Sequence, residues 1–153
     1  MKILYISPEN TVGTMTLWKD IHKKNGNECE VLTMYKSLNQ SEPGICLNLP
    51  FISSNKTYLN ARHKYYKIFR GKLGDYQELE GFPPTWRANS FLEKLYFNFR
   101  DWVWSFYVEE AIREYDLYNY DIYHFEWGLD FYRDCRFAKE LYRRNKTIIC
   151  TYH

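Results

Sequence analysis

The feature that most constrains the fold is a repeated order of strand, loop, helix and strand, because this order makes a βαβ unit. The first copy starts with the apolar run Lys2–Ser7, which Pro8 closes. An amphipathic helix over Thr14–Asn25, stopped by Asn25 and Gly26, and a strand over Glu28–Tyr35 follow. The two strands of such a unit are almost always parallel and joined by a right-handed crossover.

The end of the chain repeats this order. Strands are expected over Tyr120–Glu126 and Lys146–Tyr152, with an amphipathic helix over Asp130–Arg144 between them. Two βαβ units predict an α/β protein, and specifically a Rossmann-like three-layer α/β/α sandwich with a mostly parallel sheet.

The middle of the chain is less regular. The run ICLNLPFI at residues 45–52 is a candidate third strand, and residues 71–84 are expected to form a loop because glycines and prolines interrupt them. Asn89 and Ser90 can cap a long helix that runs through about Glu114, with aromatic residues on more than one face.

Length and composition fit one folded domain over residues 1–153. A net charge of +2 gives no reason to expect a nucleic-acid partner, and an aromatic content of 20% excludes a disordered chain. The four cysteines form no CxxC pair and are typical of free thiols in a reducing compartment. This cysteine pattern leads us to expect a cytoplasmic protein, and no run of about 20 apolar residues predicts a membrane-spanning helix.

In parallel sheets, ligands bind beyond the carboxyl ends of the strands, which directs attention to the loop Pro8–Thr14, to residues 126–129 and to His153. The first loop contains neither GxGxxG nor a P-loop lysine, so a standard dinucleotide or triphosphate site is disfavoured and no cofactor is expected. Gly13 and Thr14 stand at a helix start, where backbone N–H groups can approach a phosphate. The residues alone leave open whether Gly13 is a turn residue or a ligand contact.

The expected strand Tyr120–Glu126, within the run YDIYHFEWG, carries a second group of candidate ligand-binding residues. His124 and Glu126 point to the same side of this strand, and Trp127 follows. A buried glutamate is costly unless it lies at a strand end, where it can meet water or a ligand. A sugar suits this place, because tryptophan stacks on pyranose rings and a carboxylate accepts hydrogen bonds from hydroxyl groups. His124 lies deeper, and a histidine satisfied within the core is the simpler interpretation of it.

The spacing of histidines, cysteines and serines matches no metal-binding motif and no nucleophile motif, so no metal ligand is predicted. The one strong charge asymmetry is the run 56–72, with six basic residues and no acid. A solvated helix face is its simplest interpretation, followed by a surface for anionic lipid or a phosphate-bearing acceptor, and then by single-stranded nucleic acid. A peripheral contact with the inner membrane surface through residues 56–72 therefore stays open.

The order of these motifs resembles the N-terminal domain of GT-B glycosyltransferases of the large retaining family four. Members typically begin with a strand and a glycine loop, enter the second strand through "GHeV", and later show "DIVHAHdW" and a strand ending "tTyHg". This chain contains four corresponding motifs in the same order: MKILYIS, NGNECEV, DIYHFEWG and KTIICTYH. Asn27 replaces the usual histidine of the strand entry, and Glu126 stands where many members have a second histidine.

The resemblance implies roles for individual residues. Gly13 would contact phosphate or acceptor, and His153 would lie beside the reacting centre. Nucleotide-sugar donors bind the C-terminal domain of the family, which this chain lacks, so we expect an N-terminal fragment that is inactive alone. The implied activity of the complete enzyme is transfer of a sugar from a nucleotide sugar to a glycan or lipid-linked acceptor. The alternative is a stand-alone, flavodoxin-like module that binds a phosphorylated small molecule or a protein partner.

Overall fold

The computed structural model describes residues 1–10, 13–36, 44–51, 90–127 and 130–151, and the single positions 57, 60, 61, 64, 65, 68 and 88. These residues form β1 (Lys2–Ser7), α1 (Thr14–Lys24), β2 (Glu28–Thr33), β3 (Ile45–Cys46), α3 (Phe91–Glu114), β4 (Ile122–Glu126), α4 (Arg136–Arg143) and β5 (Thr147–Thr151). The strands make one parallel, five-stranded sheet in the order β3-β2-β1-β4-β5. The predicted Rossmann-like α/β fold is confirmed.

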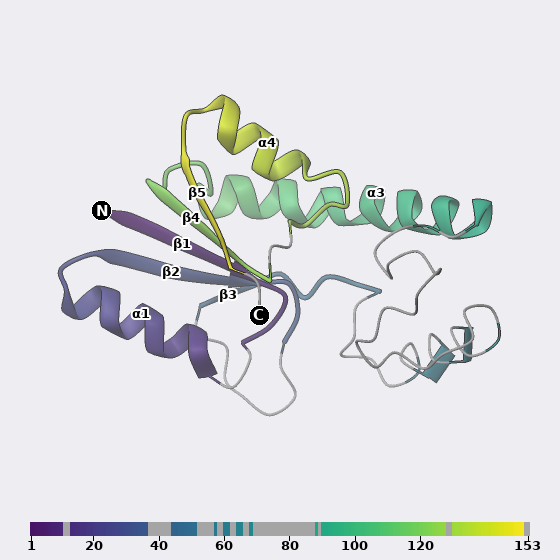
Figure 1. The fold of residues 1–153 in the computed structure, drawn as a ribbon, viewed down its shortest axis with the longest axis horizontal. Coiled ribbons are helices and arrows are strands. Elements are labelled where there is room, and N and C mark those ends of the chain that lie inside the picture. The colour runs from purple at the N-terminus through teal and green to yellow at the C-terminus, as the bar shows by residue number, and fades with distance from the viewer. Residues whose placement is uncertain are drawn as a thin grey trace.

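Helices cover both faces of the sheet, with α1 on one side and α3 and α4 on the other (Figure 1). The alternation of side chains along β1 shows the two layers of the core. Leu4 and Ile6 pack into the large cluster beneath α3 and α4, whereas Ile3 and Tyr5 pack into a smaller cluster with Met15 of α1. A strand covered on both faces needs apolar residues at nearly every position, which explains the continuous run in the sequence.

Helix α1 covers only part of its face. Its buried residue Met15 packs with residues of β1 and β2, whereas Ile149 of β5 on the same face is 43% exposed. Its neighbour Ile148 packs against the large core on the opposite face. The side of the sheet that carries α1 is therefore partly open over β4 and β5.

Two predicted elements are shorter than expected. The third strand contains only Ile45 and Cys46. Beyond it the chain stays beside β2, because Leu47 N and Leu49 N donate to the carbonyl oxygens of Thr33 and Met34 at 3.0 and 2.8 Å, but Asn48 between them has a left-handed φ of 48° that interrupts the strand. The helix expected to begin at Asp130 begins at Arg136 instead. The Asp130 carboxylate accepts hydrogen bonds from the backbone N–H groups of Tyr132 at 3.1 Å and Ala138 at 2.7 Å, so it holds a turn before the helix. Burial raises the pKa of Asp130 despite these two donors.

The long helix α3 begins as predicted. The Ser90 side chain accepts a hydrogen bond from Glu93 N at 3.2 Å and caps the first turn. Trp104, further along, donates from Nε1 to the Pro50 carbonyl oxygen at 2.7 Å and ties the helix to the segment after β3. Within the described ranges, no helix has the length and apolarity needed to cross a bilayer. The expected loop 71–84 and most of the basic run 56–72 lie outside the described residues.

Tyr123 of β4 has a buried hydroxyl whose ionisation opposes folding. It donates to the Leu117 carbonyl oxygen at 2.8 Å and accepts from Tyr120 N at 3.3 Å. Burial raises the pKa of Tyr123 to about 12 from its ordinary value of 10.0. Because the pKa is higher in the folded than in the unfolded chain, the stabilisation is complete below pH 10 and is lost progressively as pH rises toward 12.

We therefore expect Tyr123→Phe to lower stability at neutral pH but to reduce the further loss of stability at alkaline pH. At pH 8 the variant loses about 1–3 kcal/mol of unfolding free energy, because a buried carbonyl group loses its donor. Between pH 9 and 11 its stability falls about 1 kcal/mol less than that of the wild type, because one raised tyrosine pKa is gone. Urea titrations followed by circular dichroism measure both effects. Tyr142→Phe is the matched control, because Tyr142 is 77% exposed, and equal alkaline slopes in all three proteins would contradict the prediction.

Candidate functional site

The strand order reverses direction at β1. The chain adds β2 and β3 on one side of this strand and then adds β4 and β5 on the other. In open parallel sheets, ligands bind beyond the carboxyl ends of the strands at such a switch point. Ser7 ends β1 here, and its hydroxyl donates to the Glu9 carbonyl oxygen at 2.7 Å. The Asn10 side-chain amide donates to Thr16 Oγ1 at 3.3 Å and ties the following loop to α1.

The end of β4 places a buried carboxylate beside a partly exposed indole. Glu126 is the last residue of the strand and is only 4% exposed, whereas Trp127 is 36% exposed. Trp127 has a φ of 63°, a left-handed conformation that is uncommon for a bulky side chain and that ends the strand. The pair combines a hydrogen-bond acceptor with a flat apolar surface at the ligand edge of the sheet.

Glu126 belongs to a row of polar side chains on the face of the sheet that carries α1. We call Tyr5, His22, His124, Glu126 and Thr151 the polar row. His124 Nε2 lies 3.7 Å from Glu126 Oε1 and is hydrogen-bonded to the Thr151 hydroxyl of β5. The ring of His124 lies 4.7 Å from the ring of Tyr5, centroid to centroid, and the Tyr5 hydroxyl is hydrogen-bonded to His22 Nε2 at 2.9 Å. The polar row thus links β5, β4, β1 and α1.

Tyr5 stays protonated at neutral pH within this row. Burial is the main cause that raises its pKa to about 12, and electrostatic interactions with Cys29 and Glu126 contribute to the same rise. The protonated hydroxyl can donate one hydrogen bond and accept another. The contacts of His124 with Tyr5 and Thr151 support its interpretation as a histidine satisfied within the fold, while its proximity to Glu126 brings it to the candidate site.

Gly13 and Thr14 form a separate group at the start of α1. Gly13 takes the left-handed conformation with φ 73° directly before the helix, which glycine adopts at little cost. No described side chain caps this helix start, and its first turn carries no acidic residue, whereas His22, Lys23 and Lys24 occupy its last turn. Backbone N–H groups at a helix start of this kind favour an anion.

The structure thus brings His124 and Glu126 together, with Trp127 adjacent in the chain, and places Gly13 and Thr14 on another element at the same edge of the sheet. His153 lies outside the described residues, as do residues 128 and 129.

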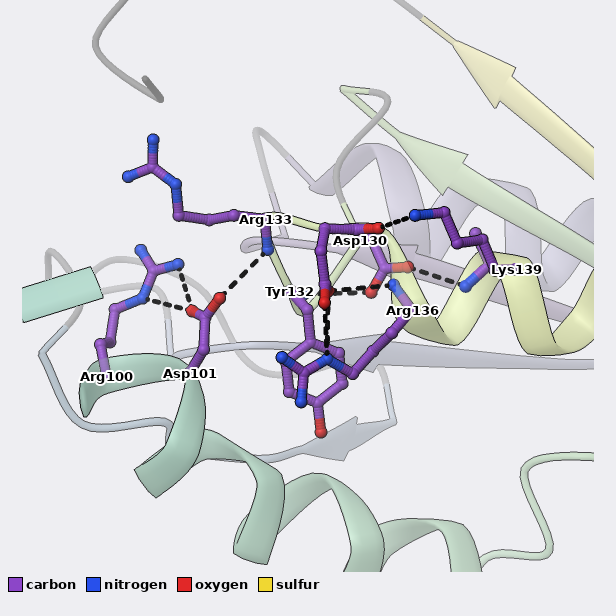
Figure 2. A network of polar contacts seen from close by, with 9 residues as sticks. Arg100, Asp101, Asp130, Tyr132, Arg133, Arg136 and Lys139 are labelled. Carbon is purple, nitrogen blue, oxygen red and sulfur yellow. Dashed lines mark hydrogen bonds and ion pairs between the residues drawn. The ribbon is translucent and has the colours of Figure 1, made fainter. Parts of the chain in front are cut away.

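A second cluster surrounds Asp101 on the inner side of α3 (Figure 2). Asp101 is 7% exposed, and its Oδ1 accepts hydrogen bonds from Arg100 Nη2 at 2.7 Å and Nε at 3.1 Å. Its Oδ2 accepts the backbone N–H of Arg133 at 3.4 Å, from the turn between β4 and α4. We call Arg100, Asp101, Arg133, Asp134 and Arg136 the arginine cluster.

Each arginine of the cluster lies over an aromatic ring. The guanidinium carbon of Arg133 is 3.5 Å from the Phe97 ring centre, that of Arg100 is 4.2 Å from Trp104, and that of Arg136 is 4.4 Å from Tyr132. Stacking of this kind holds the flat guanidinium groups in fixed orientations.

The cluster borders an open pocket of about 310 Å³ between α3 and the turn before α4. Its lining contains three cationic side chains, Lys94, Arg133 and Arg136, and two carboxylates, Asp101 and Asp134. The pocket thus has the hydrogen-bond donors that a carboxylate or phosphate requires, on a partly aromatic floor.

Sequence reasoning missed Tyr5, Thr151 and the arginine cluster. Tyr5 reads as one more apolar residue of a buried strand, and Thr151 as a β-branched strand residue. The approach of Asp101 to Arg133 joins positions 32 residues apart, which no local pattern encodes. The sequence signal that existed was an acidic residue within an otherwise aromatic stretch of a helix.

Comparisons with known proteins do not identify the chain: no protein-family model matches it, and no curated protein or solved structure is significantly similar to it. Within the part of the chain that the structure describes, no group of three or more His, Cys, Asp or Glu side chains is arranged to hold a metal ion.

The two aspartates of the arginine cluster are expected to differ in their effect on stability. Asp101→Ala leaves Arg100 and a backbone N–H without their buried acceptor and costs about 2–4 kcal/mol of unfolding free energy. Asp134→Ala removes a carboxylate that is 54% exposed and paired with Arg136 at 3.0 Å, and it costs less than about 1 kcal/mol. Urea denaturation of both variants measures the difference. Equal costs would show that the Asp101 contacts contribute no more than a surface ion pair.

Proposed function

We propose that this domain is the acceptor-binding half of a two-domain glycosyltransferase. The observation that carries the proposal is the end of β4, where buried Glu126 and partly exposed Trp127 stand side by side at the switch point of a parallel sheet. A pyranose ring offers hydroxyl groups for the carboxylate and an apolar face for the indole. The resemblance of the ordered motifs to family-four GT-B enzymes, noted in the sequence, supports the same conclusion.

The start of α1 fits the donor side of such a reaction. A nucleotide sugar releases a diphosphate, so the enzyme must stabilise negative charge that develops on the leaving group. The helix N-terminus at Gly13 favours an anion at the edge of the sheet where Glu126 and Trp127 lie. In this proposal the nucleotide itself binds a second domain, and His153, two residues beyond β5, lies beside the transferred sugar.

The arginine cluster indicates what kind of acceptor would suit this domain. Its pocket adjoins the turn that follows β4 and presents two guanidinium groups, each stacked on a ring. Guanidinium groups bind carboxylate and phosphate through paired hydrogen bonds. A glycan acceptor with an acidic sugar or a phosphate group would use both regions.

A second candidate function is a stand-alone module that binds a phosphorylated small molecule. The arginine-lined pocket and the start of α1 favour it, because guanidinium groups and a helix N-terminus both attract anions without the need for a second domain. The two candidates differ in whether the 153-residue chain binds its ligand alone.

Transfer activity is the first test of the glycosyltransferase proposal. The protein encoded by the complete natural reading frame is expected to release nucleoside diphosphate from a UDP- or GDP-sugar in the presence of a glycan acceptor. Glu126→Gln and Trp127→Ala should each raise the acceptor KM at least about tenfold, which corresponds to about 1.4 kcal/mol, and leave the donor KM unchanged. Trp18→Ala is the matched control, because Trp18 is 40% exposed on α1. Absence of diphosphate release from all common nucleotide sugars would refute the proposal.

Thermal unfolding of the 153-residue chain separates the two candidates. The glycosyltransferase proposal predicts no stabilisation by UDP- or GDP-sugars, because the donor site belongs to the second domain. A stand-alone module would be stabilised by its phosphorylated ligand, with a rise in Tm of about 5 °C or more at 100 times Kd. Pyrophosphate and a panel of sugar phosphates serve as probes. Arg136→Ala should abolish any such rise if the ligand occupies the arginine cluster.

A further inference from the structure

The outward side of α3 carries a regular row of large apolar residues. We call this row the outer stripe, and it consists of Leu92, Leu95, Phe99, Trp102 and Phe106. Successive members are separated by three, four, three and four residues. A helix with 3.6 residues per turn places all five along one side, opposite the side that buries Trp104, Val108 and Ala111 in the core.

The outer stripe is exposed in the single chain. Its members are between 48% exposed, at Leu95, and 75% exposed, at Leu92. The aromatic members contact one another, with ring centres 6.0 Å apart between Phe99 and Trp102 and 5.1 Å apart between Trp102 and Phe106. These three rings therefore form a continuous apolar surface, which borders Phe51, whose ring centre lies 6.0 Å from that of Phe99. The helix itself runs along the length of the molecule and beyond the ends of the strands (Figure 1).

The spacing of the outer stripe indicates a helical partner. A helix that is apolar on all sides is normally buried on all sides. Alternation of three and four residues is the seam of two helices that pack side by side with interlocking side chains. Helical spacing places the charged residues of this part of α3, Glu93, Lys94, Arg100 and Asp101, on the side away from the outer stripe, where Glu93 and Asp101 are buried. A partner helix would thus meet no charge between Phe91 and Phe106.

The sizes of the side chains favour a second copy of the same helix in antiparallel orientation. The N-terminal end of the outer stripe carries the two leucines, and its C-terminal end carries Trp102 and Phe106. An antiparallel pair places each leucine opposite an aromatic ring of the other copy, so large and small side chains alternate across the seam. A parallel pair would crowd tryptophan against tryptophan at one end and leave leucine against leucine at the other.

The exposed area is also sufficient for a dimer. Large aromatic side chains bury roughly 150–250 Å² each, so a half-exposed stripe of five residues offers on the order of 500 Å² in each copy. Two copies together then remove about 1,000 Å² or more from water, which reaches the size of a specific interface. We propose that the protein forms a twofold-symmetric homodimer through antiparallel packing of the outer stripe of α3.

Sedimentation equilibrium and light scattering test this dimer on the 153-residue chain. The wild type is expected to have twice the chain mass at micromolar concentration, and the double variant Phe99→Glu with Trp102→Glu to have the mass of one chain. Far-ultraviolet circular dichroism and Tm should show that this variant stays folded, because both residues are exposed in the single chain. Tyr142→Glu is the matched control, because it places the same charge at a residue that is 77% exposed on α4, and it should stay dimeric.

A wild-type chain that remains monomeric at about 100 μM would overturn the proposal. So would a monomer that sediments with anionic phospholipid vesicles and loses this binding in the double variant, because the outer stripe would then be a membrane contact. A dimer that survives the double variant would place the interface elsewhere and would equally refute it.

Cross-linking tests the antiparallel orientation. In a background with Cys46, Cys135 and Cys150 changed to serine, single cysteines are placed at positions 92, 99 and 106, while Cys29 stays buried. Antiparallel helices that cross near residue 99 bring the two copies of that residue within about 10 Å, but separate the two copies of residue 92 by about 20 Å. A short bis-maleimide should therefore link Phe99→Cys dimers and leave Leu92→Cys and Phe106→Cys unlinked. Equal linking at all three positions would indicate parallel helices and refute the antiparallel dimer.

Discussion

The rest of the structure depends on the central position of β1. This strand is paired with a neighbouring strand along each edge, and helices cover both of its faces. Leu4 and Ile6 are fully buried on one side, and Ile3 and Tyr5 are almost as buried on the other. A strand held in this way cannot shift its register without exposing one of two apolar sets. Its carboxyl end is therefore a fixed point, and the loop to α1 and the end of β4 are positioned relative to it.

The fold was predictable because its signals are local. Apolar runs of five or six residues marked β1, β4 and β5, and Ser90 marked the start of α3, where its side chain does cap the helix. The prediction failed at α4, where Asp130 precedes a run with helical periodicity but bonds to Ala138, eight residues further on. Periodicity describes which face a residue takes once a helix exists, whereas a carboxylate that binds distant backbone decides where the helix begins.

The candidate site was predictable only where it coincides with strand ends. Glu126 and Trp127 could be found because parallel sheets bind ligands beyond the carboxyl ends of their strands, and Gly13 because it precedes a helix. Tyr5 and the arginine cluster could not be found, because their surroundings come from separate elements. The Tyr5 hydroxyl meets His22 of α1, and Asp101 of α3 meets the turn after β4. Such contacts exist only after the sheet has assembled.

The two edge strands of the described sheet differ in length, and this difference affects the tendency of the incompletely folded protein to aggregate. β3 is an edge of two residues, which offers an incoming strand almost no hydrogen-bonding groups. At the other margin of the described sheet, β5 is five residues long, rich in β-branched side chains, and has Ile149 exposed. An open, uncharged edge of this kind is a template on which another chain can add a strand. Self-association through misfolding would therefore begin at β5, on the opposite side of the sheet from the edge that the chain keeps short.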